Sequence, residues 1–101
     1  MLRQEDAWRT TGRNSKTLVK YPDLRLVLIL LRAGKRMEGH RTGESISIHC
    51  LKGKLRLHLP SGMVDLTQGQ LLTLERCLPH DVEALEESSF LLALSWQPSG
   101  S

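Results

Sequence analysis

The sequence predicts an all-β protein, built as an antiparallel sandwich or barrel. Between residues 24 and 96, short apolar runs follow one another at a spacing of roughly 8 to 12 residues, the spacing of short strands joined by turns. Glycine, proline, serine or aspartate separates most of these runs. The 101 residues fit one domain that can bury a core of its own. Regularly spaced short strands of this kind are typical of sandwiches and barrels.

The first expected strand is "LRLVLILL", at residues 24–31, which is apolar almost throughout. Within it, the unbroken apolar run Leu26 to Leu31 is flanked by Arg25 and Arg32, which is consistent with a buried strand. The run is far shorter than the roughly 20 residues that cross a bilayer, so we expect no membrane partner.

The next two strands are expected at residues 45–51 ("SISIHCL") and 54–59 ("KLRLHL"). In 54–59, leucine alternates with lysine, arginine and histidine, which places the leucines on one half-buried face. Lys52 and Gly53 separate the two runs, and glycine supplies the positive φ that a two-residue turn often demands. The sequence therefore predicts a hairpin in which 45–51 pairs with 54–59.

Four further runs complete the expected strands, at residues 63–66, 70–74, 80–85 and 90–96. The stretch 82–94 is also rich in helix formers, and propensity alone would make it a helix. However, Ser88 and Ser89 interrupt any apolar helical face, and apolar residues alternate with acidic ones in 80–85. We therefore expect two strands joined by a turn at 86–89.

Composition and charge indicate an ordinary folded domain. Of the residues, 40% are hydrophobic and 25% are charged, while only 4% are aromatic, so aliphatic side chains must build the core. The net charge is +3, and only residues 9–20 form a mildly basic segment. We expect no nucleic-acid partner, because that function needs a concentrated basic face with stacking aromatics. The chain divides into an N-terminal arm (1–22), a barrel (23–97) and a tail expected to fray (98–101).

The two cysteines, Cys50 and Cys77, indicate a reducing location. They form no CxxC arrangement. The N-terminal residues contain no apolar segment of the kind found in secretory signals. Both observations predict a cytoplasmic protein.

The glycines and histidines of residues 34–84 resemble the two motifs of the cupin superfamily, in its small single-domain form. Gly34, His40 and Gly53 fall in register with the first motif, and Gly69 and His80 fit the second. The short spacer between the motifs matches that of compact cupins. The resemblance implies an antiparallel jelly-roll barrel, also called a double-stranded β-helix, which is commonly paired as a homodimer.

The same resemblance implies where a metal would be held. Metal-binding cupins hold Fe, Mn, Ni or Zn through two histidines and a glutamate of the first motif and one histidine of the second. Here only His40 and His80 remain, because Thr42 stands at the second histidine position and Ile46 at the glutamate position. Two imidazoles without an anionic ligand should bind a transition metal weakly, so we expect no cofactor. A two-histidine, one-carboxylate site of His40, His80 and Glu44 stays open as an alternative.

Other roles compete for the remaining polar and aromatic residues. His40 can hydrogen-bond a backbone carbonyl, and His80, after Pro79, can cap a turn. His49 and His58 lie on strand positions that face away from the neighbouring Ile46/Ile48 and Leu55/Leu57 faces, so both are expected on the surface or in an interface. Trp8 and Trp96 are expected to cover the barrel or a dimer interface.

Three functions fit this sequence. The favoured one is a metal-free module that binds or senses an unknown small molecule in an apolar pocket lined by His40, Thr42, Ile46, Gln70 and His80. The alternative is a metal-dependent dioxygenase, isomerase or decarboxylase with an atypical site on His40 and His80. The third is a purely structural homodimer, whose barrel is filled by Ile46, Ile48, Leu55, Leu57, Leu72 and Leu74. We expect a homodimer because of the surplus of apolar residues and the two tryptophans near the chain ends.

Overall fold

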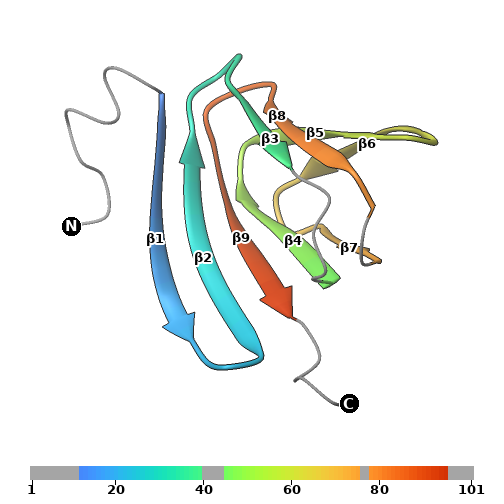
Figure 1. Ribbon diagram of the computed structural model, residues 1–101. Coiled ribbons are helices and arrows are strands. Elements are labelled where there is room, and N and C mark those ends of the chain that lie inside the picture. Colours follow the sequence, from blue (N-terminus) through green and yellow to red (C-terminus); the bar gives the residue numbers. More distant parts are fainter. Residues whose placement is uncertain (1–11, 40–44, 76–77, 96–101) are drawn as a thin grey trace.

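Two antiparallel β-sheets face each other in the computed structural model, which describes residues 12–39, 45–75 and 78–95 (Figure 1). The large sheet has the strand order β1-β2-β9-β4-β7, and the small sheet has the order β3-β8-β5-β6. Within the described residues the strands are β1 (Arg13–Lys20), β2 (Leu24–Leu31), β3 (Arg36–Gly39), β4 (Ser45–Lys52), β5 (Lys54–Leu59), β6 (Gly62–Thr67), β7 (Leu71–Leu74), β8 (His80–Ala84) and β9 (Ser88–Ser95).

The core lies between the two sheets and is built from alternate residues of their strands. On β5, for example, Leu55 and Leu57 are fully buried, while Arg56 and His58 between them are only partly buried. Phe90 is the largest fully buried side chain. The buried hydrophobic residues form one cluster: Ile29, Leu31, Met37, Ile46, Ile48, Cys50, Leu55, Leu57, Leu66, Leu74, Val82, Ala84 and Phe90.

All seven strands expected from the apolar runs are present. The stretch 82–94 divides as predicted, because β8 ends at Ala84 and β9 begins at Ser88. Burial therefore outweighs helix propensity in this stretch. Val82, Ala84 and Phe90 are fully buried, and they lie at alternate positions of their strands.

The N-terminal arm expected over residues 1–22 needs correction, because residues 13–20 form strand β1. This strand pairs antiparallel with β2, from Arg13 opposite Leu31 to Lys20 opposite Arg25, with a bulge between Thr17 and Val19. Most of its side chains are exposed, so no apolar alternation marks it in the sequence. Its main-chain hydrogen bonds place it at the edge of the large sheet, and such bonds require no particular side chain. The apolar pattern did not predict the short strand β3 for a similar reason. Among its described side chains, only Met37 is buried.

The predicted hairpin between residues 45–51 and 54–59 is wrong. β4 pairs with β9 and β7 in the large sheet, whereas β5 pairs with β6 and β8 in the small sheet. Gly53 has a φ of +88°, as expected of a turn glycine, but it turns the chain from one sheet to the other. Alternation fixes the face that each strand buries and leaves the partner strand open, so the sequence pattern is the same for both connections.

Hydrogen bonds of Ser88 link this connection between the sheets, here called a crossing, to a second one. The chain also passes between the sheets from β8 to β9, and the Ser88 hydroxyl lies where the two crossings meet. The Lys54 amide donates to Ser88 Oγ (3.0 Å), and the hydroxyl donates to the Glu86 carbonyl (2.7 Å). Ser88 is 3% exposed, so these bonds satisfy a buried polar group.

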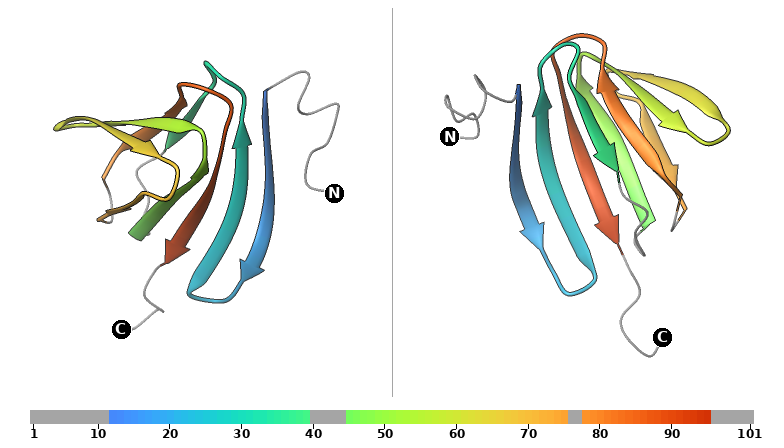
Figure 2. Two further views of the ribbon diagram at one scale, coloured as in Figure 1. Left: turned by 180° about the vertical axis from the view of Figure 1, so that it is seen from behind. Right: turned by 45° about the horizontal axis from the view of Figure 1, so that its top comes forward.

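The large sheet extends beyond the small one. Figures 1 and 2 show the β1–β2 hairpin reaching past the small sheet, while the β5–β6 hairpin projects from the other side of the molecule. Across the described residues we find no helix that is long and apolar enough to span a membrane.

Candidate functional site

The candidate site lies at one end of the two sheets, where β8 and β4 begin. The chain connects the sheets twice at this end, between Gly39 and Ser45 and between Leu74 and His80. Across the inner face of the large sheet, the register aligns four residues in one row: Arg25, Leu94, Ile46 and Leu74. We call this part of the molecule the His80 end.

His80 is an inward-facing histidine that is 6% exposed. It alternates with Val82 and Ala84, both fully buried, so it lies on the core side of β8. Its Nδ1 atom lies 3.1 Å from the Leu78 carbonyl oxygen and donates to it in the tautomer that this contact requires. The bond fixes the ring at the start of β8, and in a neutral imidazole it leaves Nε2 as the acceptor nitrogen. His80 thus combines the turn-capping role with the inward position that the sequence predicted.

Ile46 occupies the inner face of β4, as predicted from the alternation. It is 6% exposed and pairs with Leu94 on one side and Leu74 on the other. The side chain has no donor atom for a metal, although the resemblance gives this position to a carboxylate ligand. Within residues 12–39, 45–75 and 78–95, no three His, Cys, Asp or Glu residues come together as a metal-binding group. The described residues therefore do not fit a transition metal, because they offer one inward imidazole beside apolar walls.

Three of the predicted site residues, His40, Thr42 and Glu44, lie outside the described residues. Cys77, Trp8 and Trp96 do so as well. The predicted proximity of His40 and His80 therefore stays a prediction. The last described residue before His40 is Gly39, and it pairs with His80 across β3 and β8.

Gln70 does not line the interior, which corrects its expected place in the pocket. It is exposed in the turn between β6 and β7, where its side-chain oxygen accepts from the Thr67 amide (2.8 Å) and the Thr67 hydroxyl (3.1 Å). Its carbonyl also accepts from the Cys50 amide (2.9 Å). These bonds hold the turn together and give Gln70 a structural role.

Arg25 is an inner-face residue that was not among the expected site residues. It pairs with Leu94 and shares its side of β2 with Val27 and Ile29, and its Nε atom is buried. The available signal was a charged residue inside an apolar strand, in the same alternation as the core residues. In the β1–β2 register, Lys20 of β1 lies opposite Arg25 of β2. Two cationic residues therefore lie at one end of the row that contains Ile46.

The outer face of the small sheet is polar and carries ion pairs. His58 points outward as predicted, with Nε2 2.8 Å from Glu83 Oε1. Arg36 pairs with Asp81 (2.9 Å), and Arg56 binds Asp65 through two bonds of 2.8 and 3.1 Å. The hydrogen bond from Arg56 lowers the pKa of Asp65 below its ordinary value of 3.8. These groups are too exposed to form an enclosed site.

Cys50 is a buried thiol on the inner face of β4. Its Sγ atom lies 3.7 Å from the Lys52 and Gly53 carbonyl oxygens. Burial raises the pKa of the thiol above its ordinary value of 9.0, which keeps it protonated at neutral pH. Cys50 is therefore a packing residue and not a nucleophile.

Comparison with known proteins identifies the fold. No family model matches the chain, and no curated protein matches it in sequence. A conserved protein of unknown function from Streptococcus pyogenes has a similar structure, with a TM-score of 0.81 and 21% identity over 89% of this chain and 79% of that chain. An RmlC-like cupin from Shewanella frigidimarina has a TM-score of 0.79 and 16% identity over 88% of this chain and 80% of that chain.

A third similar structure belongs to a larger protein. It is an HTH_3 family transcriptional regulator from Vibrio cholerae, with a TM-score of 0.78 and 20% identity over 86% of this chain. The match covers 52% of the regulator's chain. The two facing antiparallel sheets and these similarities establish that the protein has the cupin jelly-roll fold, as the motif frame of residues 34–84 predicted.

Proposed function

We propose that the protein is a cytoplasmic, metal-free module that binds or senses a small molecule at the His80 end. The observation that carries this proposal is Ile46, a buried aliphatic residue in the place of an anionic metal ligand, in one row with Arg25. An apolar wall with a few polar groups is the usual composition of a small-molecule site. His80 supplies one such group, through its Nε2 atom.

The filled core limits where a ligand can bind. Ile48, Leu55 and Leu57 have no exposed surface, so the middle of the barrel is packed by its own side chains. This agrees with part of the third function considered above, in which apolar residues fill the barrel. His80 and Arg25 differ from this packed middle, because each is a polar residue on the inner face of its strand and close to the strand's first residue.

The row of inner-face residues indicates which class of ligand the protein would bind. Arg25 and Lys20 are cationic and lie at the β1–β2 side of the row, whereas Leu94, Ile46 and Leu74 continue it with aliphatic groups. Guanidinium groups bind carboxylates through paired hydrogen bonds. A small organic anion with an apolar body would complement both parts of the row. The structural similarity to half of a transcriptional regulator supports a sensing role for such binding.

The second candidate is an enzyme that holds a metal through His40 and His80, with Glu44 as the anionic ligand. The observation in its favour is the anchored ring of His80, because metal-binding histidines commonly donate their other nitrogen to a carbonyl or carboxylate. The cupin fold is also shared with an ectoine synthase from P. lautus, which matches with a TM-score of 0.74 and 18% identity over 85% of this chain and 65% of that chain.

Metal retention separates the two candidates. Untagged protein would be incubated with Fe(II), Mn(II), Ni(II) or Zn(II), dialysed, and submitted to elemental analysis. We expect no stoichiometric metal, because a buried isoleucine replaces the charge that would offset a dication. Retention of one equivalent by the wild type, together with its loss in His80→Ala, would overturn the proposal in favour of the enzyme.

Thermal unfolding tests the ligand class. The probes are small aliphatic and aromatic carboxylates and their uncharged amides. At a hundredfold excess over its dissociation constant, a bound carboxylate should stabilise the fold by about 2.7 kcal/mol and raise the melting temperature by several degrees. We expect the shift to disappear in Arg25→Gln and to persist in Arg56→Gln, whose arginine lies on the outer face of the small sheet. Equal shifts with acid and amide would contradict the role of Arg25.

A further inference from the structure

Among the described strands, β1 is the longest that lies at the edge of a sheet. It has eight residues, whereas the other edge strands, β7, β3 and β6, have four, four and six. Most of its side chains are exposed, and its hairpin with β2 reaches past the small sheet (Figures 1 and 2). No strand of the described residues lies on the side of β1 that faces away from β2. We call this side the free edge of β1.

The hydrogen bonds to β2 show which main-chain groups of β1 face the free edge. The Arg32 amide donates to the Gly12 carbonyl (2.7 Å), and these two residues lie opposite each other when the β1–β2 register is continued by one pair. Hydrogen-bonded and non-hydrogen-bonded pairs alternate along an antiparallel ladder. The N–H and C=O groups of Ser15 and Thr17 therefore point away from β2.

Two further contacts agree with this direction. The Ser15 amide donates to the side-chain Oδ1 of its neighbour Asn14 (2.9 Å), so a side chain supplies the acceptor that a strand would otherwise supply. Beyond the bulge, the Tyr21 amide donates to the Leu24 carbonyl (2.7 Å), which makes the next pair along, that of Lys20, non-hydrogen-bonded. The main-chain groups of Lys20 thus face the free edge as well.

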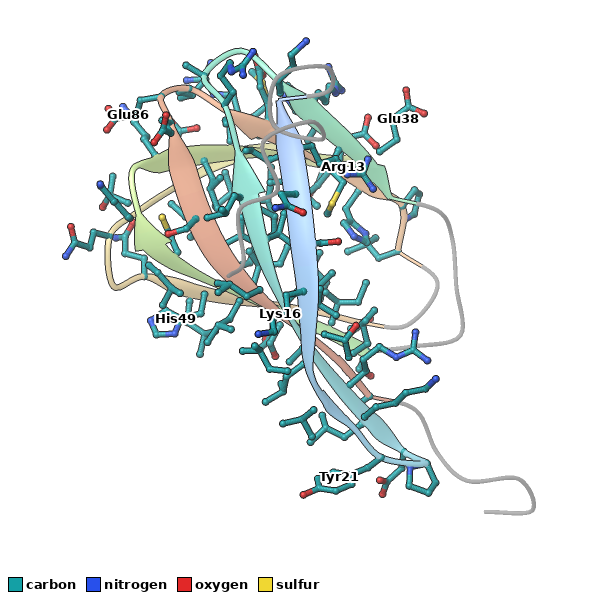
Figure 3. All side chains as sticks on the ribbon, turned by 90° about the vertical axis from the view of Figure 1, so that its left-hand side faces the viewer. Arg13, Lys16, Tyr21, Glu38, His49 and Glu86 are labelled. Carbon is teal, nitrogen blue, oxygen red and sulfur yellow. The ribbon has the colours of Figure 1, made fainter. Side chains whose placement is uncertain are left out.

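The side chains of β1 indicate what kind of strand fits beside it. Lys16 lies opposite Leu28, which faces away from the core, and Lys20 lies opposite Arg25 of the inner face. Figure 3 views the molecule from the β1 side and shows Lys16 projecting from this strand. The described strands of the large sheet contain no aspartate or glutamate. A second β1 would bring like charges together, whereas an acidic strand would complement the lysines.

We propose that an acidic, extended segment of another protein adds to the free edge of β1 and becomes a sixth strand of the large sheet. Main-chain hydrogen bonds to Ser15, Thr17 and Lys20 hold the segment, which is how strand addition generally supplies affinity. Carboxylates beside Lys16 and Lys20 provide the selectivity, because opposite charges on neighbouring strands attract and like charges repel.

The bulge of β1 sets the spacing of these carboxylates. Lys16 and Lys20 are four residues apart in β1, but the residues opposite them on the regular strand β2, Leu28 and Arg25, are three apart. A regular strand on the free edge spans the same length, so its two acidic residues also lie three positions apart. An odd spacing places one carboxylate on each face of the sheet, as the two lysines are placed.

A nuclear magnetic resonance titration of the labelled protein tests the proposal. The probe is a peptide of about eight residues, built from threonine and valine with two glutamates three positions apart, and the comparison peptide has glutamines instead. We expect the glutamate peptide to shift the amide signals of Ser15, Thr17 and Lys20 and to bind about fivefold more tightly than the glutamine peptide. Equal affinities, or no shifts at millimolar peptide, would overturn the proposal.

Two pairs of variants separate the main-chain and charge contributions. Thr17→Pro removes an N–H that points away from β2, so it should abolish binding and leave the fold intact by circular dichroism, whereas Thr17→Ala keeps that N–H and the binding. Lys16→Glu should weaken binding of the glutamate peptide about fivefold. Lys52→Glu, at an exposed position of β4, changes the net charge equally and should have no such effect.

Three outcomes would contradict the addition of a strand. Binding that survives Thr17→Pro, or that falls equally in Lys52→Glu, indicates a general attraction of anions to a cationic surface. Vesicles that contain phosphatidylserine would then bind as well, and a lipid surface would replace the peptide as the partner. Shifts of the same amide signals with protein concentration, in the absence of peptide, would show that a second copy occupies the free edge.

Discussion

At the scale of single residues, burial decides what each polar or reactive side chain can do. Cys50 has no exposed surface, and burial raises the pKa of its thiol. His80 is buried too, but a hydrogen bond to Leu78 leaves its second nitrogen as an acceptor. Both side chains are buried, but only the imidazole keeps a nitrogen that can accept a hydrogen bond from a ligand.

We predict that Cys50 is protected from thiol reagents in the folded protein. In a Cys77→Ser variant, Cys50 is the sole thiol, and its reaction with Ellman's reagent can be followed alone. The native rate should be at least ~1000-fold below the rate in denaturing guanidinium chloride, since access requires unfolding and unfolding constants of ordinary domains are that unfavourable. A native rate within tenfold of the denatured rate, on the order of a free thiolate's, would refute the packing role.

Alternation in the sequence predicts which way most candidate residues point, and it fails where no strand exists. Ile46, His49, His58 and His80 all face the side that a period of two assigns to them. Gln70 lies in a turn, where hydrogen bonds to Thr67 fix its side chain and alternation has no meaning. Arg25 has the periodicity of the core residues, but its charge did not suggest a place on the inner face.

At the scale of strands and turns, the crossing at Gly53 restricts most strictly which residue type can occupy a position. Its φ of +88° lies in the left-handed region, and an added Cβ would meet Ser88 Oγ and the Glu87 carbonyl oxygen. Ser88 cannot move aside, because its hydroxyl bonds the backbone of both crossings. The turn therefore needs glycine for its dihedral angles and for its space.

We predict that Gly53→Ala lowers the free energy of unfolding by about 2–4 kcal/mol, the sum of backbone strain and displacement of Ser88. Urea denaturation followed by circular dichroism measures this loss. The matched control is Gly69→Ala, because Gly69 has the same φ of +88° and nothing within 4 Å of an added Cβ. It should cost only about 1–2 kcal/mol. Equal losses in the two variants would show that the contact with Ser88 contributes nothing.

The strands were more predictable than their pairing. Apolar runs bounded by turn residues mark β2 and β4 to β9 to within a few residues. The error at Gly53 arose because a hairpin and a sheet crossing share the pattern of two alternating runs around a glycine. What separates them is the pairing of β5 with β8 and of β4 with β9, between segments far apart in the chain. Local periodicity carries no information about such contacts.

At the scale of the whole molecule, the two sheets depend on long-range pairing. β9 is the centre of the large sheet, between β2 and β4, and it contributes Phe90 to the core. The two remaining pairs, β1 with β2 and β4 with β7, have no hydrogen bonds to each other. Without β9, the large sheet would therefore divide into two separate pairs of strands.

We predict that a chain ending at Glu87 does not fold, whereas a chain ending at Ser95 does. The shorter chain lacks β9. Its core therefore lacks Phe90, and β2 and β4 each have an unpaired edge. Thermal unfolding should show no cooperative transition for it, and a cooperative one for the chain ending at Ser95. A cooperative transition in the shorter chain would mean that one sheet suffices for the fold.

The central place of β9 also governs how the protein is made. A ribosome releases the strands in chain order, so the middle of the large sheet is the last of the described strands to emerge. Until then, β2 and β4 lack the partner strand β9, so main-chain N–H and C=O groups along one edge of each strand are unpaired. Such edges aggregate readily in a growing chain, and we expect molecular chaperones to shield them during synthesis. We therefore expect the large sheet to be complete only after residue 95 has been translated.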